Sequence, residues 1–145
     1  MLGDITSYGA LPALEASMRF AAARHPLILN NIANLSTPDY RPMDVSVEGF
    51  QKALRQAIDE RRTANGGQSG SLPLSDSREV GVLADGRLAL RPSTPSDNIL
   101  FHDRNNRDLE RTMQSLVENS TVFRVSTELI KNRFDLLRSA IAERV

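Results

Sequence analysis

The side chains with the most obvious capacity for chemistry in this sequence are its two histidines, His25 and His102. A catalytic or metal-binding histidine needs a carboxylate or further ligands at a defined spacing. Neither histidine has an Asp or Glu in a recognised catalytic or ligand spacing. His25 instead falls on the apolar seam of an expected helix, where we interpret it as a packing residue. The sequence therefore predicts no catalytic residue, no metal site and no enzyme.

The other motifs that resemble reactive sites have simpler interpretations. Ser120 and Thr127 fall at heptad positions, where a hydroxyl is expected to set the register of a helix pair rather than act as a nucleophile. The stretch "GGQSG" lacks the lysine and the strand–helix setting of a nucleotide-binding loop. Without cysteine there are no disulfides and no thiolate metal ligands. We predict no cofactor.

Composition excludes further classes of function. The 145 residues suit one domain, and 18 basic and 18 acidic side chains cancel without gathering into a stripe. A nucleic-acid partner is therefore not expected. No segment approaches the roughly 20 apolar residues of a membrane span, so direct membrane insertion is not expected either. The first residues lack the basic and apolar regions of a cleaved secretory signal.

The elements that position these residues begin with a heptad pattern near the N-terminus. Steps of three and four alternate through Leu11, Leu14, Met18, Ala21, His25, Ile28, Ile32 and Leu35. Pro12 suits the first helical turn, where a missing N–H costs little. Pro26 removes an interior hydrogen bond and is expected to kink the helix, or to split it near His25.

A longer heptad pattern occupies the C-terminal third. It runs through Leu109, Met113, Leu116, Ser120, Phe123, Thr127, Ile130, Phe134, Leu137 and Ile141. This pattern predicts one helix from about Arg107 to about Glu143, roughly 55 Å long at 1.5 Å per residue. Asn105 or Asn106 is the expected N-cap.

The middle of the chain has a different character. Residues 47–62 predict a short amphipathic helix, and the Gly/Ser-rich residues 63–71 a flexible linker. Alternating apolar residues on either side of Asp85-Gly86 predict a β-hairpin. The expected fold is all-α, with long N- and C-terminal heptad helices packed as an antiparallel coiled coil and a loop-rich middle. Residues 1–36 and 104–145 would form the coiled-coil domain, and 37–103 the intervening region.

Three asparagines end the first helix, in the stretch "NNIANLSTPDY". Asn30, Asn31 and Asn34 lie off the apolar seam, where a solvated surface would normally carry Glu and Lys. Asparagine offers a donor and an acceptor with no net charge to desolvate, which suits contacts between subunits. A simpler alternative is that Asn34 only caps the helix, with Pro38 following as expected.

At this point the sequence resembles a known family. "NNIANLSTPDYR" is similar to the signature of the flagellar rod, hook and hook-filament axial proteins, typically Asn-Ile-Ala-Asn, two variable residues, then Thr-Pro-Gly-Tyr. "RPMDVSVEGFQKAL" and the segment from "NNRDLERTMQS" to "LLRSAI" resemble the basal-body rod members of that family. The resemblance extends over residues 14–58 and 104–142.

The resemblance implies a structural role. Such a protein is exported without a cleaved signal and polymerises through its terminal helices into the periplasmic rod of the flagellar basal body. The rod is the axial tube that transmits torque and passes exported subunits. Its implied partners are copies of itself, other rod proteins, the rod-base/MS-ring adaptor and the export gate. A soluble coiled-coil adaptor or secretion chaperone is the alternative.

The residues expected at subunit contacts form two groups. Near the end of the first helix they are Asn30, Asn31, Ile32, Asn34, Thr37, Pro38 and Tyr40. In the last helix they are Leu109, Met113, Leu116, Phe123, Ile130, Phe134, Leu137 and Ile141.

The turn after the first helix departs from the family pattern. Asp39 stands where the family has glycine, and a non-glycine residue is disfavoured at positive φ by Cβ contacts. Proline at the second position of a turn fits type I, and Asp is comfortable near φ −90° at the third. We therefore expect a type I turn at residues 37–40.

Overall fold

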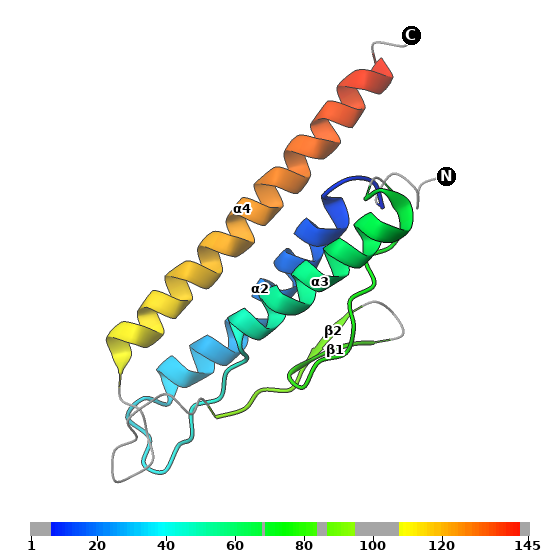
Figure 1. Cartoon of the computed structure of the whole chain (residues 1–145). Coiled ribbons are helices and arrows are strands. Elements are labelled where there is room, and N and C mark those ends of the chain that lie inside the picture. Colours follow the sequence, from blue (N-terminus) through cyan, green and yellow to red (C-terminus); the bar gives the residue numbers. More distant parts are fainter. Residues whose placement is uncertain (1–6, 68, 84–86, 95–107, 143–145) are drawn as a thin grey trace.

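The computed structural model describes residues 7–67, 69–83, 87–94 and 108–142. The chain is mostly helical, and its elements follow the order α2, α3, β1, β2, α4. Figure 1 shows α2 in the middle, with the long α4 along one side and α3 with the two strands on the other. None of the helices in the described ranges is long and apolar enough to cross a bilayer.

Helix α2 spans Leu11–Ala33 and continues through Pro26. The expected split near His25 is therefore wrong. Pro26 lies on the exposed side of the helix, so the carbonyl that loses its N–H partner faces water rather than the protein interior. The helix ends at Ala33, and Asn34 is its C-cap.

Helix α3 spans Val47–Asn65, three residues further than the sequence pattern indicated. Ser46 caps its start, because the Ser46 hydroxyl accepts a hydrogen bond of 2.9 Å from the backbone N–H of Gly49. Gly66 ends it in the left-handed conformation at φ 65°. The predicted linker is therefore helical over residues 63–65.

The predicted β-hairpin is confirmed. β1 (Val80–Val82) pairs antiparallel with β2 (Leu88–Leu90), with Val80 opposite Leu90 and Val82 opposite Leu88. Its expected turn at Asp85-Gly86 lies outside the described residues. Val80 and Val82 lie on the same face of β1, and Val80 is buried in the core whereas Val82, at the end of the strand, is 39% exposed.

Helix α4 spans Leu109–Ala142, so the long C-terminal helix is confirmed to within two residues at each end. Its N-cap is Asp108, whose carboxylate accepts a 2.9 Å hydrogen bond from the backbone N–H of Arg111. The expectation of a cap at Asn105 or Asn106, which lie outside the described residues, was therefore wrong. A carboxylate at this place also interacts favourably with the positive end of the helix dipole.

The apolar core joins α2 to the middle of the chain. Phe20 of α2 stacks on Phe50 of α3 with ring centroids 4.0 Å apart, and Val45 and Val80 complete the buried cluster. Leu88 and Leu90 of β2 and Leu74 pack around it. Because this cluster occupies one side of α2, its other side is left for α4.

Helices α2 and α4 pack along each other and run in opposite directions in Figure 1. The two long terminal helices and their mutual packing agree with the expected fold. The finer expectation of a regular coiled coil, and the division into residues 1–36 with 104–145 and residues 37–103, remain predictions. The last turns of α4 project beyond the start of α2 (Figure 1), and every residue from 131 to 142 is exposed.

Candidate assembly surface

The contact between α2 and α4 is built from small and polar side chains. Ala21 is 1% exposed, and its carbonyl accepts a 2.9 Å hydrogen bond from the side-chain amide of buried Asn119. Ser126, one heptad further along α4, is also buried. Small side chains let two helix backbones approach closely. Asn119 and Ser126 were not among the predicted contact residues.

The heptad seam predicted for α4 coincides with the less exposed side of the helix only in part, since its members Leu116 and Ile130 are half-buried. Asn119 and Ser126 are buried, whereas the predicted seam residues Ser120 and Thr127, one position later, are exposed. Phe123 and Phe134 remain 41% and 43% exposed. Apolar spacing identifies where hydrophobic side chains recur, but the most buried side chains of α4 are the polar Asn119 and Ser126. The larger apolar side chains therefore form the edge of the contact.

An open groove of about 670 Å³ follows that edge between α2 and α4. Its floor and walls are formed by Ala21, Ala22 and His25 of α2 and by Asn119, Ser120, Phe123, Arg124, Thr127 and Glu128 of α4. We call it the α2–α4 groove. His25 is half-buried at its wall, which agrees with a packing residue.

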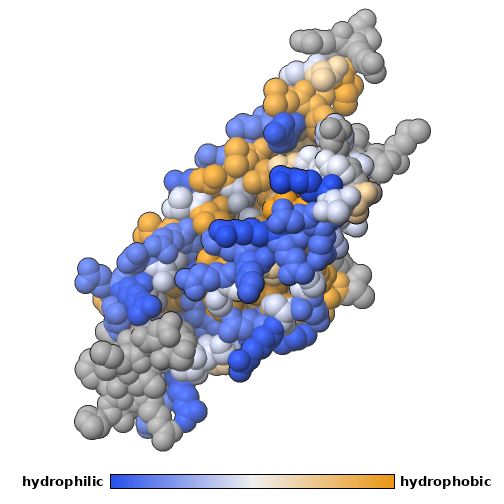
Figure 2. Space-filling view, in the orientation of Figure 1, coloured by the Kyte–Doolittle hydropathy of each residue, from blue (hydrophilic) through white to orange (hydrophobic). Residues whose placement is uncertain are grey.

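Exposed apolar side chains extend along the rest of α4. Those with more than a third of their surface exposed are Leu109, Met113, Val117, Val122, Phe123, Val125, Leu129, Phe134, Leu136, Leu137 and Ile141. Figure 2 shows hydrophobic side chains gathered over the projecting C-terminal part of this helix. A helix that is apolar on several faces is normally buried. The described chain alone does not bury α4.

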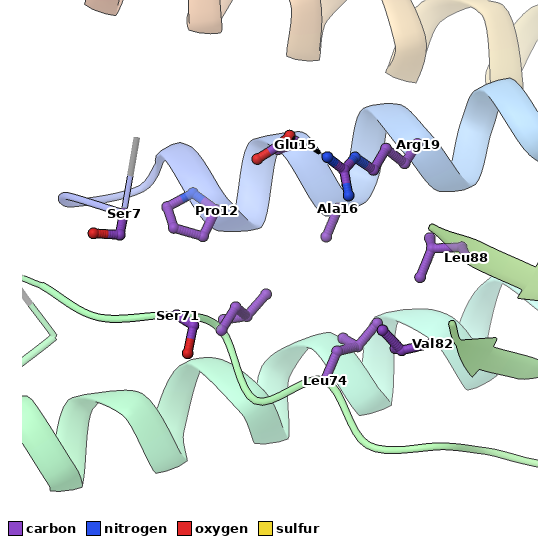
Figure 3. Close-up of a pocket in the computed structure, with 10 residues that line it drawn as sticks. Ser7, Pro12, Glu15, Ala16, Arg19, Ser71, Leu74, Val82 and Leu88 are labelled. Carbon is purple, nitrogen blue, oxygen red and sulfur yellow. Dashed lines mark hydrogen bonds and ion pairs between the residues drawn. The ribbon is translucent and has the colours of Figure 1, made fainter. Parts of the chain in front are cut away.

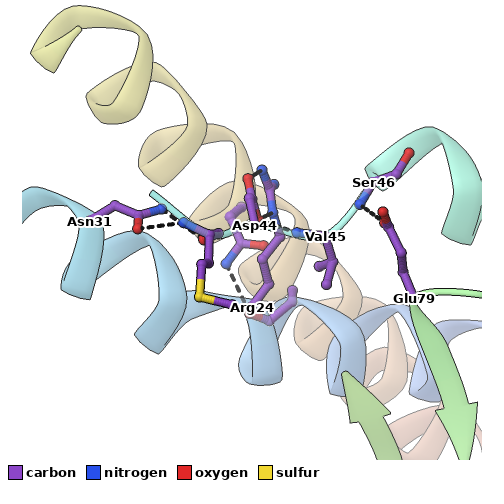
Figure 4. Close-up of polar contacts among 9 residues, drawn as sticks. Arg24, Asn31, Asp44, Val45, Ser46 and Glu79 are labelled. Atoms are coloured by element: carbon purple, nitrogen blue, oxygen red, sulfur yellow. Dashed lines mark hydrogen bonds and ion pairs between the residues drawn. The ribbon is translucent and has the colours of Figure 1, made fainter. Parts of the chain in front are cut away.

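The asparagines at the end of α2 make contacts within the chain. The Asn31 amide donates a hydrogen bond to the Met43 carbonyl (2.9 Å), and its oxygen accepts from the Met43 N–H (3.1 Å) and the Tyr40 hydroxyl (2.8 Å). Asn31 thus pairs with the backbone as a neighbouring strand would (Figure 4). A side chain with both a donor and an acceptor is needed for this, which explains asparagine at this position.

Asn34 caps the C-terminus of α2 through contacts with Asn30. The Asn34 side-chain amide donates to both the carbonyl and the side-chain oxygen of Asn30, each at 2.9 Å, and the Thr37 hydroxyl donates to Asn34 at 3.3 Å. The alternative that Asn34 caps the helix is therefore confirmed. Contacts of these residues with other subunits remain a prediction.

The turn that follows is not the expected type I turn. Asp39 has φ 59°, and the Tyr40 N–H donates to the Thr37 carbonyl at 3.4 Å. Positive φ at the third position is the feature of a type II turn, in which glycine is preferred. The prediction was wrong because the chain must return to reach Asn31, and Asp tolerates the left-handed conformation better than most side chains.

A polar network then fixes the returning chain. Arg24 of α2 is buried and binds both carboxylate oxygens of Asp44, at 2.8 and 2.5 Å. The Asp44 backbone pairs with Ser93, and the Glu79 carboxylate accepts from the Ser93 hydroxyl and from the Ser46 N–H (Figure 4). Sequence reasoning missed Arg24. The available signal was a charged residue directly between the apolar positions Ala21 and Ile28.

A second buried arginine ties the N-terminal segment to the end of α3. The Arg61 guanidinium donates to the carbonyls of Gly9 (2.7 Å), Ser7 (2.6 Å) and Ser69 (3.4 Å). Its five N–H donors suit several backbone acceptors at once. The available signal was its position four residues after Ala57, on the apolar side of α3, whereas Arg62 beside it is exposed.

A smaller cavity of about 270 Å³ lies between the start of α2, residues 71–74 and the hairpin. Figure 3 shows Pro12, Ala16, Leu74, Val82 and Leu88 around it. At its edge, Glu15 and Arg19 form an exposed ion pair at 2.6 Å. No set of polar side chains converges there, so its lining suits an apolar contact rather than catalysis.

The sequence of the chain is similar to those of two known proteins. The chain is 29% identical over 113 residues to the flagellar basal body rod protein FlgB of Borrelia hermsii, covering 77% of this chain and 79% of that one. The chain is similar to FlgB. FlgB of Bacillus subtilis (strain 168) is 26% identical over 134 residues, covering 92% of this chain and 93% of the relative. No family model matches the chain.

The likeness to FlgB confirms the resemblance to basal-body rod proteins, which rested on the segment after the asparagine motif and on the C-terminal helix. Both relatives are aligned over more than three quarters of their own length. The similarity therefore concerns whole chains rather than one shared helix.

Proposed function

We propose that this protein is a structural component of the flagellar basal-body rod, as the names of its two relatives suggest. It polymerises through its terminal helices into the axial tube that transmits torque and passes exported subunits. The observation that carries the proposal is the row of exposed apolar side chains along α4, which a lone chain leaves in water.

The proposal extends to partners and location. Copies of the same chain, other rod proteins, the rod-base/MS-ring adaptor and the export gate are the neighbours that the resemblance implies. The periplasmic part of the basal body is the proposed location, reached by export without a cleaved signal. In this assembly the turn at residues 30–44 is a rigid corner, since Asn31 and Arg24 hold both of its sides.

Phe134→Asp tests the proposal. Phe134 is 43% exposed in the single chain, so a charge there has little effect on the fold. In an assembled rod the same charge is buried without a partner, which costs several kcal/mol. We expect cells that carry only this variant to synthesise the protein but to be non-motile and to lack rods in electron micrographs of basal bodies.

Thr121→Asp is the matched control, because it adds the same charge to an exposed polar position of α4 that lies seven and fourteen residues before the acidic side chains Glu128 and Asp135. It should leave motility intact. Normal motility of the Phe134→Asp strain would contradict burial of this helix face in the assembly. A sharply defined soluble dimer in sedimentation, with no protein in basal bodies, would instead favour the coiled-coil adaptor.

A further inference from the structure

Helix α4 carries a second apolar row on the face turned away from the α2–α4 groove. Val122, Val125, Leu129 and Leu136 follow steps of three, four and seven residues and are 45% to 63% exposed. We call this row the outer stripe. At about 100° per residue, its members lie on one face of the helix, roughly opposite Phe123 and Thr127. No described residue covers it.

The groove and the outer stripe have complementary shapes. Ala21, Ala22, Ser120 and Thr127 are small and leave space between the larger groove residues such as His25 and Phe123, so the open groove has room for side chains from another helix. Valine and leucine at heptad spacing are the side chains that fill such a groove between helices. We propose that the α2–α4 groove of one copy receives the outer stripe of α4 from a second copy, with the two α4 helices parallel. This pairing rests on the proposed function, because it identifies the faces through which the copies polymerise.

Charge supports this choice of occupant. Arg124, Lys131 and Arg138 recur every seven residues beside the groove, and we call them the basic row. Glu128 and Asp135 also recur at seven residues and form an acidic row on the side nearer the outer stripe. No ion pair joins these five side chains to another described residue.

The order of the rows around α4 makes the charges match between copies. Around the axis of α4 the order is the groove face, the basic row, the acidic row and the outer stripe. The face that contacts α2 lies between the outer stripe and the groove face. When a parallel α4 places its outer stripe in the groove, its acidic row lies along the basic row of the first copy. The shared spacing of seven residues lets the two rows meet repeatedly, as charges flanking a coiled-coil seam do.

The pairing also determines the kind of assembly. The groove and the outer stripe are different surfaces. After every addition, the series therefore has a free groove at one end and a free outer stripe at the other. Such a heterologous contact produces a ring or an open helical series, not a closed two-fold dimer.

Charge exchange between two variants tests the pairing. In the first, Arg124→Glu, Lys131→Glu and Arg138→Glu make both rows acidic, and in the second, Glu128→Lys and Asp135→Lys make both rows basic. These side chains are exposed, so circular dichroism should show both variants folded. Each variant alone should lose self-association in sedimentation at low salt, and an equimolar mixture should regain it. Association of either variant alone at the wild-type level, or no recovery in the mixture, would overturn the proposal.

Cysteine cross-linking supplies a geometric readout, because the chain has no cysteine of its own. Thr127→Cys places a thiol in the groove, and Val122→Cys, Val125→Cys, Leu129→Cys and Leu136→Cys place one on the outer stripe. At least one stripe variant, mixed with Thr127→Cys and oxidised, should give far more disulfide-linked dimer than either variant alone. A chain carrying both cysteines of that pair should give a ladder of multimers.

Lys52→Cys on the exposed face of α3 is the control partner for Thr127→Cys. Equal cross-linking with this control, or efficient dimerisation of Thr127→Cys alone, would overturn the pairing in favour of non-specific or groove-to-groove contact. The result is separate from the proposed function. If the chain is found in basal bodies but does not form these cross-links, the rod role stands and this pairing is wrong. If the cross-links form but the chain is absent from basal bodies, the pairing stands and the rod role is wrong.

Discussion

At the scale of single residues, Asp39 occupies a conformation that glycine adopts at lower cost. Its φ is 59°, and an L side chain in the left-handed region is strained by Cβ contacts, although less for Asp than for most residues. The strain is tolerated because Asn31 holds the chain on the far side of the turn by three hydrogen bonds.

Asp39→Gly should therefore raise the free energy of unfolding by about 0.5 to 1 kcal/mol, measured by urea denaturation. Gly66→Ala is a control in the opposite direction, because it places a side chain on a residue that already has positive φ. Gly66 has φ 65°, and an added Cβ would meet no atom within 4 Å, so only backbone strain changes. That variant should lose about 1 kcal/mol. A loss of stability in Asp39→Gly would show that its carboxylate has a role which the turn geometry does not explain.

Tyr40 provides a pH-dependent measure of the same turn. Burial raises the pKa of the Tyr40 hydroxyl above its usual 10, because the charged phenolate is disfavoured there. A raised pKa in the folded state contributes stability that is present below pH 10 and is lost as the pH rises through the raised value. The neutral hydroxyl is also the form that donates to Asn31.

Tyr40→Phe should lower the free energy of unfolding by about 1 kcal/mol at neutral pH, through loss of that hydrogen bond. The difference from the wild type should shrink as the pH rises above 10, in parallel denaturation curves. Tyr8→Phe, at an exposed ring, should leave stability nearly unchanged. A difference for Tyr40→Phe that stays constant into strongly alkaline solution would argue against a buried hydroxyl donor.

At the scale of elements, the α2·α4 contact depends on how closely the two backbones approach. Ala21 is 1% exposed and Ala22, its neighbour, is exposed. Ala21→Leu should overpack the contact and lower the free energy of unfolding by about 1 to 3 kcal/mol. Ala22→Leu, the same change on the groove side, should alter it by less than about 0.5 kcal/mol. Both values can be measured by urea denaturation, and equal effects would mean that α4 does not pack on α2 in solution.

The element scale also shows how the parts depend on one another. Helix α2 contacts both α4 and the cluster around Phe50. Arg24 lies between these two faces and binds Asp44, so the polar network separates the apolar core from the helix pair. The middle of the chain therefore holds α2 in place while α4 presents its apolar side chains outward.

At the scale of the whole molecule, one side of α2 is stabilised within the chain and much of α4 is not. The long helix projects past its partner, and large apolar side chains remain exposed along its length. This division suits a subunit in which one part folds by itself and the other is completed by neighbours. The α2–α4 groove and the outer stripe are the two surfaces that such neighbours would share.

Local patterns in the sequence determined the elements. Period and turn chemistry identified both long helices, the short helix and the hairpin, because hydrophobic spacing and glycine turns act over a few residues. The motif ending in Tyr40, together with residues 41–54 and the C-terminal segment, was also sufficient to recognise the likeness to rod proteins. Tertiary structure alone decided which face of α4 meets α2, since backbone approach at Ala21 favours small side chains over the apolar ones that define a heptad. It likewise decided that Asn31, Arg24 and Arg61 act within the chain, because their partners lie eight or more residues away in sequence, where no local spacing could predict them.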